Sequence, residues 1–320
     1  MGPPAGTTVL LLGASGFLGR HIHAAFAAAG ARVVPVSRTA KDGVALDLVR
    51  AGRRELAGLC TGADVVVNAA GAVWGGTEQE MIRLNAELPE RFTEVLAASP
   101  GRPRLVHLGS AYEYGPAPRG TPIDETWPPA PVSPYGRTKL RGGRAVLRAA
   151  GDGGLDGVVL RVSVACGPGA PRVSLPGIVV GHLAAGRGGE LRLAPLVAHR
   201  DLVDVRDVAG AVLAAAGAAP GTVAGRVVNV GGGEAVPVRA LVDLLISLSG
   251  RPVRVVEEAA ADGARSDAPW QCLDITRARR LLGWAPRRTL AASMRDLLTS
   301  AGVPVAPLEP AAPAPRRERR

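Results

Sequence analysis

The chain has 320 residues, of which 47% are hydrophobic, so it can bury a sizeable core and is not a small disulfide-stabilised protein. Its three cysteines are too far apart for a disulfide framework or a metal site, which is typical of a reducing compartment and favours the cytoplasm. The formal charge of +10 comes almost entirely from arginines spread along the chain, and aromatic residues make up only 3%, so we expect no nucleic-acid partner.

The N-terminal segment carries no signal for export. Its first apolar run, Val9 to Leu12, ends at Gly13 and is too short for a signal peptide. No apolar stretch approaches the roughly 20 residues that a membrane helix needs. We therefore expect no contact with a membrane.

Short apolar runs rich in β-branched residues recur along the first two thirds of the chain, at 9–12, 33–36, 65–67, 105–108, 158–162 and 227–230. Between them lie stretches with helical spacing, such as the one from Phe17 to Ala29. This alternation predicts an α/β fold: a Rossmann-type, doubly wound parallel sheet with helices on both faces.

The pattern also predicts how the chain is divided. We assign residues 1–166, with a return strand near 200–232, to a dinucleotide-binding domain. Residues 167–199 and 233–302, including a helical stretch at 238–248, are expected to form a smaller, discontinuous C-terminal substrate-binding domain. The proline-rich end, 303–320, is expected to be a disordered tail.

A glycine-rich loop follows the first strand and opens the first helix. Glycines in this position allow a tight turn and a close backbone approach, and the helix N-terminus favours a cofactor pyrophosphate. The spacing is G-x-x-G-x-x-G and not the general G-x-G-x-x-G, so a simple glycine-rich turn is the alternative. The candidate cofactor residues here are Gly13, Ser15, Gly16, Phe17, Leu18 and Gly19.

The end of the second strand bears on the choice between NAD and NADP. An NAD site presents an acid to the ribose hydroxyls at this point, but this chain has Ser37 and Arg38, which suit a ribose 2′-phosphate. We therefore predict NADP(H) over NAD(H), with Arg38 as an ordinary surface arginine in the alternative. Asp47 and Leu48 follow, where Asp47 can contact the adenine side or cap a helix.

The segment 133–139 predicts a helix start, with Ser133 as N-cap and a proline in the first turn. Tyr135 and Lys139 are then four residues apart and lie on one helix face. A tyrosine acting as acid or base near neutral pH needs its pKa lowered by roughly three units, which a neighbouring ammonium helps to supply. Lys139 is one of only two lysines, and it can also donate to ribose hydroxyls.

The strand at 105–108 leads to Ser110. A serine at the carboxyl end of a parallel strand faces the ligand crevice, where its hydroxyl can bond the substrate oxygen beside Tyr135. A turn serine is the structural alternative.

With these motifs the chain resembles extended short-chain dehydrogenases/reductases of the NAD-dependent epimerase/dehydratase group, over nearly everything up to Leu298. The resemblance implies a catalytic triad of Ser110, Tyr135 and Lys139, and a supporting role for Asn85 in a proton path and near the cofactor. It is carried by Gly13 to Gly19, Asn68-Ala69-Ala70-Gly71, Ser110 with Tyr114-Gly115, Tyr135-x-x-x-Lys139, Leu160-Arg161 through Gly167-Pro168, Arg200 to Val208, Asn229 to Gly232 and Leu282 to Pro286. It implies cofactor contacts at Asn68, Ala69, Ala70 and Gly71, and candidate substrate contacts at Ala111, Tyr112, Val164 and Arg200.

Residues that this chain lacks argue against some of the family's reactions. Sugar dehydratases carry an Asp-Glu pair after the serine, where Ala111 and Tyr112 stand here, and epimerases usually carry an acid after the second strand. The sequence therefore favours an NADPH-dependent ketoreductase acting on the 4-keto group of a nucleotide-activated deoxysugar, with Tyr135 donating the proton. The segment from Arg200 resembles keto-deoxysugar reductases.

Three alternatives stay open. Val164 replaces an asparagine that many nucleotide-sugar enzymes carry, which leaves room for a non-sugar, polyketide-type ketone. A nucleotide-sugar 4-epimerase with bound NAD and a non-catalytic NADP-binding protein are the others. The five histidines show no metal-ligand spacing, so we expect no metal, and a homodimer is an expectation from the resemblance alone.

Overall fold

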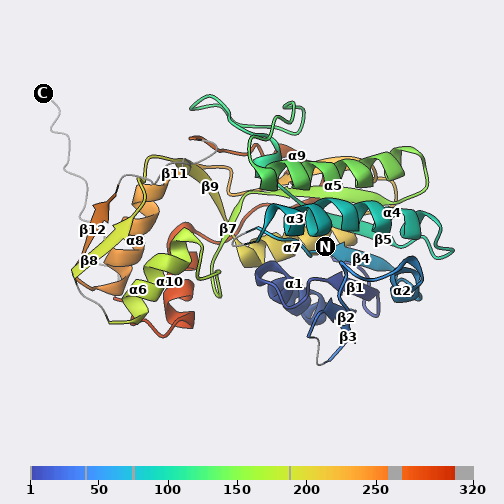
Figure 1. The fold of residues 1–320 in the computed structure, drawn as a ribbon, viewed down its shortest axis with the longest axis horizontal. Helices are drawn as coiled ribbons and strands as arrows, with labels where there is room; N and C mark the ends of the chain where they lie inside the picture. Colours follow the sequence, from blue (N-terminus) through green and yellow to red (C-terminus); the bar gives the residue numbers. More distant parts are fainter. Residues whose placement is uncertain (1, 40–41, 74–75, 187–188, 259–268, 307–320) are drawn as a thin grey trace, which may run out of the picture.

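A computed structural model describes residues 2–39, 42–73, 76–186, 189–258 and 269–306. Within this part of the chain the main element is a parallel sheet of seven strands in the order β10-β6-β5-β4-β1-β2-β3 (Figure 1). Its strands are β1 (Thr8–Leu12), β2 (Arg32–Ser37), β3 (Val44–Ala45), β4 (Val65–Asn68), β5 (Arg104–Ser110), β6 (Gly157–Val162) and β10 (Arg226–Val230). The predicted Rossmann-type fold is confirmed.

Each of the six apolar runs lies in one of these strands, and of these seven strands the sequence missed the two-residue β3. The strand order reverses at β1, whose neighbours are β2 on one side and β4 on the other. In open parallel sheets, ligands bind beyond the carboxyl ends of the strands at such a reversal.

Helices cover both faces of the sheet (Figure 1). They do so because each turns an apolar side toward it. One face carries α1 (Phe17–Ala28), α7 (Val205–Ala216) and α9 (Thr276–Leu282). The other face carries α2 (Arg53–Leu59), α4 (Leu88–Ala97) and α5 (Pro134–Gly151). The short α3 (Glu78–Met81) runs into a π-helix, η1 (Ile82–Glu87), which continues as α4, and a 3₁₀ turn, η2 (Ala111–Glu113), follows β5.

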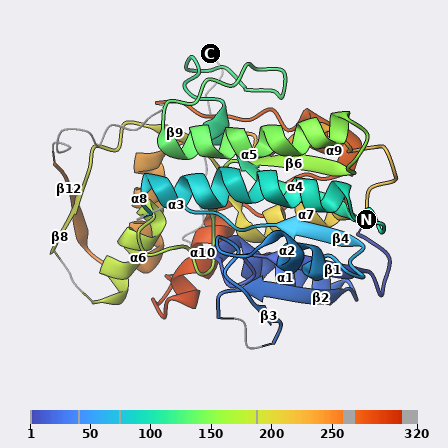
Figure 2. The same ribbon diagram turned by 45° about the vertical axis from the view of Figure 1, so that its right-hand side comes forward.

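A second group of elements has its own apolar core and lies to one side of the sheet (Figure 2). It comprises α6 (Leu175–Ala184), α8 (Val238–Ser249), α10 (Leu290–Ser300) and the parallel pair β8 (Gly189–Leu193) and β12 (Val253–Glu257). Between the two parts runs a small sheet of β7 (Val164–Cys166), β9 (His199–Asp204) and β11 (Ala235–Pro237), in the order β11-β9-β7. Helix α8 confirms the helical stretch expected at 238–248.

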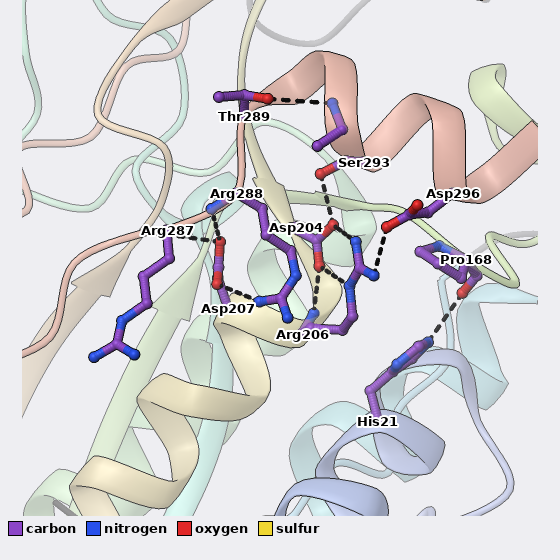
Figure 3. Close-up of polar contacts among 11 residues, drawn as sticks. His21, Pro168, Asp204, Arg206, Asp207, Arg287, Arg288, Thr289, Ser293 and Asp296 are labelled. Atoms are coloured by element: carbon purple, nitrogen blue, oxygen red, sulfur yellow. Dashed lines mark hydrogen bonds and ion pairs between the residues drawn. The ribbon is translucent and has the colours of Figure 1, made fainter.

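Ion pairs at the start of α7 fasten the two parts together (Figure 3). The Asp204 carboxylate caps α7 and accepts from Ser293 of α10 at 2.6 Å. Arg206 lies 2.7 Å from Asp204 and 2.6 Å from Asp296, which is also on α10. Asp207, almost fully buried, accepts from the backbone of Arg287 and Arg288 and from the guanidinium of Arg288.

We keep the expected division into domains as a proposal, with two departures. Helix α9 and Trp284 pack in the core of the main sheet, although 233–302 was assigned to the smaller domain. Val303, the expected start of the disordered tail, is buried against the smaller core, and the Ala306 N–H donates to the Leu248 carbonyl at 2.8 Å. Apolar burial thus orders 303–306, and 307–320 lie outside the described residues.

In the described ranges we found no helix with the length and apolar character to cross a bilayer. The same ranges hold no group of three or more histidine, cysteine or acidic side chains arranged to bind a metal.

Candidate active site

Three of the candidate polar side chains stand at the carboxyl edge of the main sheet. Ser37, Asn68 and Ser110 are the last residues of β2, β4 and β5. The register pairs Leu12 with Val36 and with Asn68, and Ser110 with Val162, so the strand ends lie close to one edge. The fold therefore places the candidates where a ligand crevice is expected.

The glycine loop connects β1 to α1 and has room for no side chain at two positions. Gly13 has φ +77°, and a Cβ there would lie 2.7 Å from the Ala70 backbone nitrogen. A Cβ on Gly19 would lie 2.1 Å from the Gly13 carbonyl oxygen. Gly16 is the N-cap of α1, whose first turn has neither a side-chain cap nor an acid. A helix start of this kind fits the pyrophosphate of a dinucleotide.

Around this loop, Ala69 and Ala70 are half-buried against Gly13, whereas Ser15 and Gly16 are exposed. At the end of β2, Ser37 is buried and Arg38 is exposed. Asp47 closes a local turn, since its carboxylate accepts from the Val49 N–H at 3.0 Å and pairs with Arg50 at 3.7 Å. Leu48 is buried. Asp47 is therefore engaged in a turn and is not the cap of a helix, because the next helix, α2, begins at Arg53 with Gly52 as its N-cap.

Two asparagines of the site, Asn68 and Asn85, form hydrogen bonds with the backbone of the loop after β4. Asn68 accepts from the Ala70 N–H at 3.1 Å, and its amide nitrogen lies 3.2 Å from His107 Nδ1. Asn85, fully buried in η1, accepts from the Ala72 N–H at 2.9 Å and donates to the Ala72 carbonyl at 2.8 Å. Both residues therefore shape the loop after β4, which carries the exposed Gly71.

Helix α5 begins as the sequence predicted. Ser133 caps it by accepting from the Gly136 N–H at 3.1 Å, and Pro134 occupies the first turn. Tyr135 and Lys139 then face β5, where the Lys139 ammonium donates to the Leu108 carbonyl oxygen. A Cβ on Gly71 would lie 3.9 Å from Lys139 Nζ, so the ammonium also borders the loop after β4.

Ser110 lies close enough to Tyr135 to affect the pKa of its hydroxyl. Burial raises the pKa of Tyr135 to about 12, the hydrogen bond from Ser110 lowers it, and the charges of Glu113 and Tyr112 raise it. The pKa of Tyr135 is thus raised, whereas the sequence led us to expect a lowered pKa, because burial outweighs any stabilisation of the phenolate. A protonated Tyr135 is nevertheless what a proton donor requires at neutral pH.

Lys139 is 5% exposed. Burial lowers the pKa of Lys139 to about 8, and the negative charge of Glu113 opposes that change. Near neutral pH the group is still mostly charged, so it can donate to the ribose hydroxyls of a cofactor.

The four candidate substrate residues have different surroundings. Ala111 is 1% exposed in a small apolar cluster, so it offers no open surface, and Tyr112 packs edge-on against Tyr135 with ring centroids 5.9 Å apart. Val164 and Arg200 lie in the small sheet, where Val164 pairs with Leu202, two residues after Arg200. Arg200 donates to the His199 carbonyl at 2.9 Å. The structure therefore groups Tyr112 with the triad and Val164 with Arg200.

Sequence reasoning missed the role of Glu113. It is 0% exposed, forms a 2.8 Å ion pair with Arg161 of β6 and accepts a hydrogen bond from the Ser110 N–H. The signal was an acid three residues after the serine, but its partner lies 48 residues away.

With the geometry in place, comparisons identify the chain's relatives. The model of the family described as "NAD dependent epimerase/dehydratase family" matches residues 9–231. A dTDP-6-deoxy-L-talose 4-dehydrogenase (NAD(P)(+)) of Kitasatospora kifunensis is 44% identical over 306 residues, covering 91% of this chain and 95% of the relative. The structure of MoeE5 in complex with UDP-glucuronic acid and NAD superposes with a TM-score of 0.81 at 25% identity, covering 92% of this chain and 99% of that one. RMD from Pseudomonas aeruginosa, complexed with NADPH, has a TM-score of 0.81 at 23% identity, covering 93% of this chain and 98% of that one, and shows the fold alone.

The fold and these matches define an NAD(P)-dependent oxidoreductase of the extended short-chain dehydrogenase/reductase type. Within that class, the chain belongs to the NAD-dependent epimerase/dehydratase family.

Proposed function

We propose that this protein transfers hydride between NADPH and C4 of a dTDP-linked 6-deoxyhexose, reducing the 4-keto sugar to the alcohol. The observation that carries the proposal is the meeting of β5 and α5 at the carboxyl edge of the sheet: Ser110 ends β5, and Lys139, one helical turn after Tyr135, donates to the Leu108 carbonyl of the same strand. The similarity to the talose 4-dehydrogenase, over almost the full length of both chains, supports the choice of substrate.

The bound nicotinamide would supply the hydride, and the residues of the chain would handle the proton. Tyr135 gives its hydroxyl proton to the ketone oxygen as the C4–H bond forms. Ser110 donates a hydrogen bond to the same oxygen while negative charge develops on it. Lys139 stabilises the ionised Tyr135 and holds the ribose hydroxyls. A proton from solvent then restores Tyr135, so atoms and charge balance.

For the cofactor we propose NADPH in preference to NADH. Arg38 is exposed at the end of β2, and buried Ser37 precedes it, so a guanidinium is available there for a ribose 2′-phosphate. Asp47, further along the chain, is engaged in its own turn. The cofactor contacts we propose are the glycine loop, Ser37, Arg38, Ala69 to Gly71, Tyr135 and Lys139.

The experiment is a screen of NADPH and NADH oxidation against nucleotide-linked 4-keto-6-deoxyhexoses and aromatic polyketide ketones. We expect turnover with the dTDP-linked sugar and NADPH, and a product that is oxidised back by NADP⁺. Turnover with an aromatic ketone and with no sugar would contradict the proposed substrate. Tightly copurified NAD, with sugar interconversion and no net redox change, would indicate a 4-epimerase.

A further inference from the structure

Glu113 is a buried acid at the centre of the candidate site. One carboxylate oxygen accepts from the Ser110 N–H at 2.7 Å, and the other lies 2.8 Å from Arg161 Nε. The Arg161 guanidinium in turn covers the ring of Tyr114 at 4.4 Å, and the Tyr114 hydroxyl donates to Asn229 at 2.7 Å. Glu113 therefore belongs to a chain of buried contacts that runs from the Ser110 backbone through Arg161 and Tyr114 to Asn229, and we call this chain of contacts the frame.

Two glycines make room for this carboxylate. A Cβ on Gly109 would lie 2.6 Å from one Glu113 oxygen, and a Cβ on Gly143 would lie 3.6 Å from the other. Gly143 is in α5, one helical turn after Lys139, which is itself one turn after Tyr135. The face of α5 that carries the candidate catalytic groups thus packs directly on Glu113.

We propose that Glu113 is a positioning residue: its carboxylate fixes Ser110 and supplies a buried negative charge that favours the protonated forms of Tyr135 and Lys139. Both effects follow from one charge, because a nearby anion favours the protonated form of an acid and of a base alike. Glu113 raises the pKa of Lys139 against the lowering by burial, and it adds to the rise that burial causes in the pKa of Tyr135. The inference rests on the proposed function, because Glu113 is proposed to act on Tyr135, the proton donor of the ketoreductase site.

Apart from Arg161, which is paired with Glu113, the other described ionisable groups around the site are neutral, lie on the outer side of α5 or are paired with one another. Burial lowers the pKa of His107 on β5 well below its usual value, so that imidazole is neutral near pH 7. On the outer side of α5, Arg137 and Arg141 pair with Glu78 and Glu90, and Arg144 is exposed. The remaining groups close to the frame are Arg161, Tyr112, Tyr114, and the pair of Glu125 with Arg277 at 3.3 Å.

The chain offers a direct test, because it contains two lysines, Lys41 and Lys139. Lysine labelled with ¹³C at Cε gives one signal from each, and the chemical shift follows the loss of the ammonium proton. Lys139 is assigned by the signal missing in Lys139→Met, and Lys41 is the internal reference. In the free wild-type enzyme we expect the Lys139 midpoint near pH 8. In Glu113→Gln we expect it about one pH unit lower.

Tyr114→Phe is the matched control, since it removes a hydrogen bond from the same frame without changing charge. It should leave the Lys139 midpoint at the wild-type value. A Glu113→Gln midpoint equal to that of wild type would overturn the inference, as would an equal shift in Tyr114→Phe. The titration needs no substrate. An absence of ketoreductase turnover would therefore refute the proposed function, while the Lys139 midpoints would still decide whether Glu113 acts on Lys139.

Glu113→Asp tests the positioning half even if Glu113→Gln does not fold. It keeps the charge beside Arg161 and shortens the reach to the Ser110 N–H by one methylene. We expect the Lys139 midpoint to stay near pH 8 and kcat to fall about tenfold or more, with the KM for NADPH unchanged. A kcat equal to that of wild type in Glu113→Asp would show that Glu113 does not position Ser110.

Discussion

Lys139 donates a hydrogen bond from its buried ammonium to the backbone carbonyl oxygen of Leu108, two residues before Ser110 in the same strand. The bond ties the helix that carries Tyr135 to the strand that carries Ser110. Because an ammonium has three N–H donors, Lys139 can hold Leu108 and ribose hydroxyls together. It is therefore both a structural link and a candidate cofactor ligand.

Replacing Lys139 with methionine should keep the packing and remove the charge. We expect turnover to fall at least about 100-fold, because ionised Tyr135 loses its stabilising cation. NADPH binding should weaken about tenfold, because hydrogen bonds to the ribose are lost. Steady-state kinetics and fluorescence titration measure the two effects. Arg144→Met, at an exposed position of the same helix, should behave as wild type.

The affinity for NADPH should depend on pH through Lys139. The pKa of Lys139 is lowered to about 8 by burial, so the ammonium is present below that pH and is lost as the pH rises through it. Binding should therefore be nearly constant from pH 7 to about 7.5 and weaken above about 8. Fluorescence titrations across this range test the point. A flat profile in wild type, or an unchanged slope in Lys139→Met, would contradict the assignment.

Gly13→Ala should destabilise the protein and abolish cofactor binding. A side chain there meets both the left-handed backbone at φ +77° and the Ala70 nitrogen at 2.7 Å, which should cost about 3 kcal/mol of unfolding free energy. Gly58→Ala is the control, because Gly58 is exposed in α2 with no neighbour within 4 Å of a Cβ. It should add about 0.5–1 kcal/mol. Urea unfolding compares the two, and equal effects would be against this role for Gly13.

Arg38→Ala should change the choice of cofactor. If Arg38 pairs with the 2′-phosphate, kcat/KM for NADPH should fall about 10- to 100-fold while that for NADH stays within about twofold. Arg32→Ala, at the exposed opposite end of β2, should alter neither value. A parallel loss for both cofactors in Arg38→Ala would mean that Arg38 does not distinguish them.

Much of this fold follows from local patterns in the sequence. Six strands of the main sheet were predictable because each contains a continuous apolar run, and α5 because Ser133 and Pro134 mark its start. The two-residue β3 was not predictable, since it forms only by pairing with Val36 and Ser37. Likewise, Asn85 and Ala72 are brought together by a π-helix that no residue pattern announces.

The pKa shifts of the site residues were harder to predict than which residues form the site. Tyr135 and Lys139 stood out as scarce residue types at helical spacing, but the direction of the Tyr135 pKa depends on how deeply the fold buries it. The charge that opposes the loss of the Lys139 proton comes from Glu113, whose partner Arg161 lies 48 residues further along the chain, on β6. Long-range burial and pairing of this kind are set by the tertiary structure.

The central claim is that Tyr135 donates the proton during reduction of the ketone. Tyr135→Phe removes one hydroxyl and keeps the ring that packs on Tyr112. The decisive measurement is NADPH oxidation by this variant with the dTDP-linked 4-keto-6-deoxyhexose, alongside its NADPH dissociation constant. We predict that turnover falls at least about 100-fold while the dissociation constant stays within about threefold of wild type. Turnover at the wild-type rate would contradict the account and favour a protein that binds NADP without using this tyrosine.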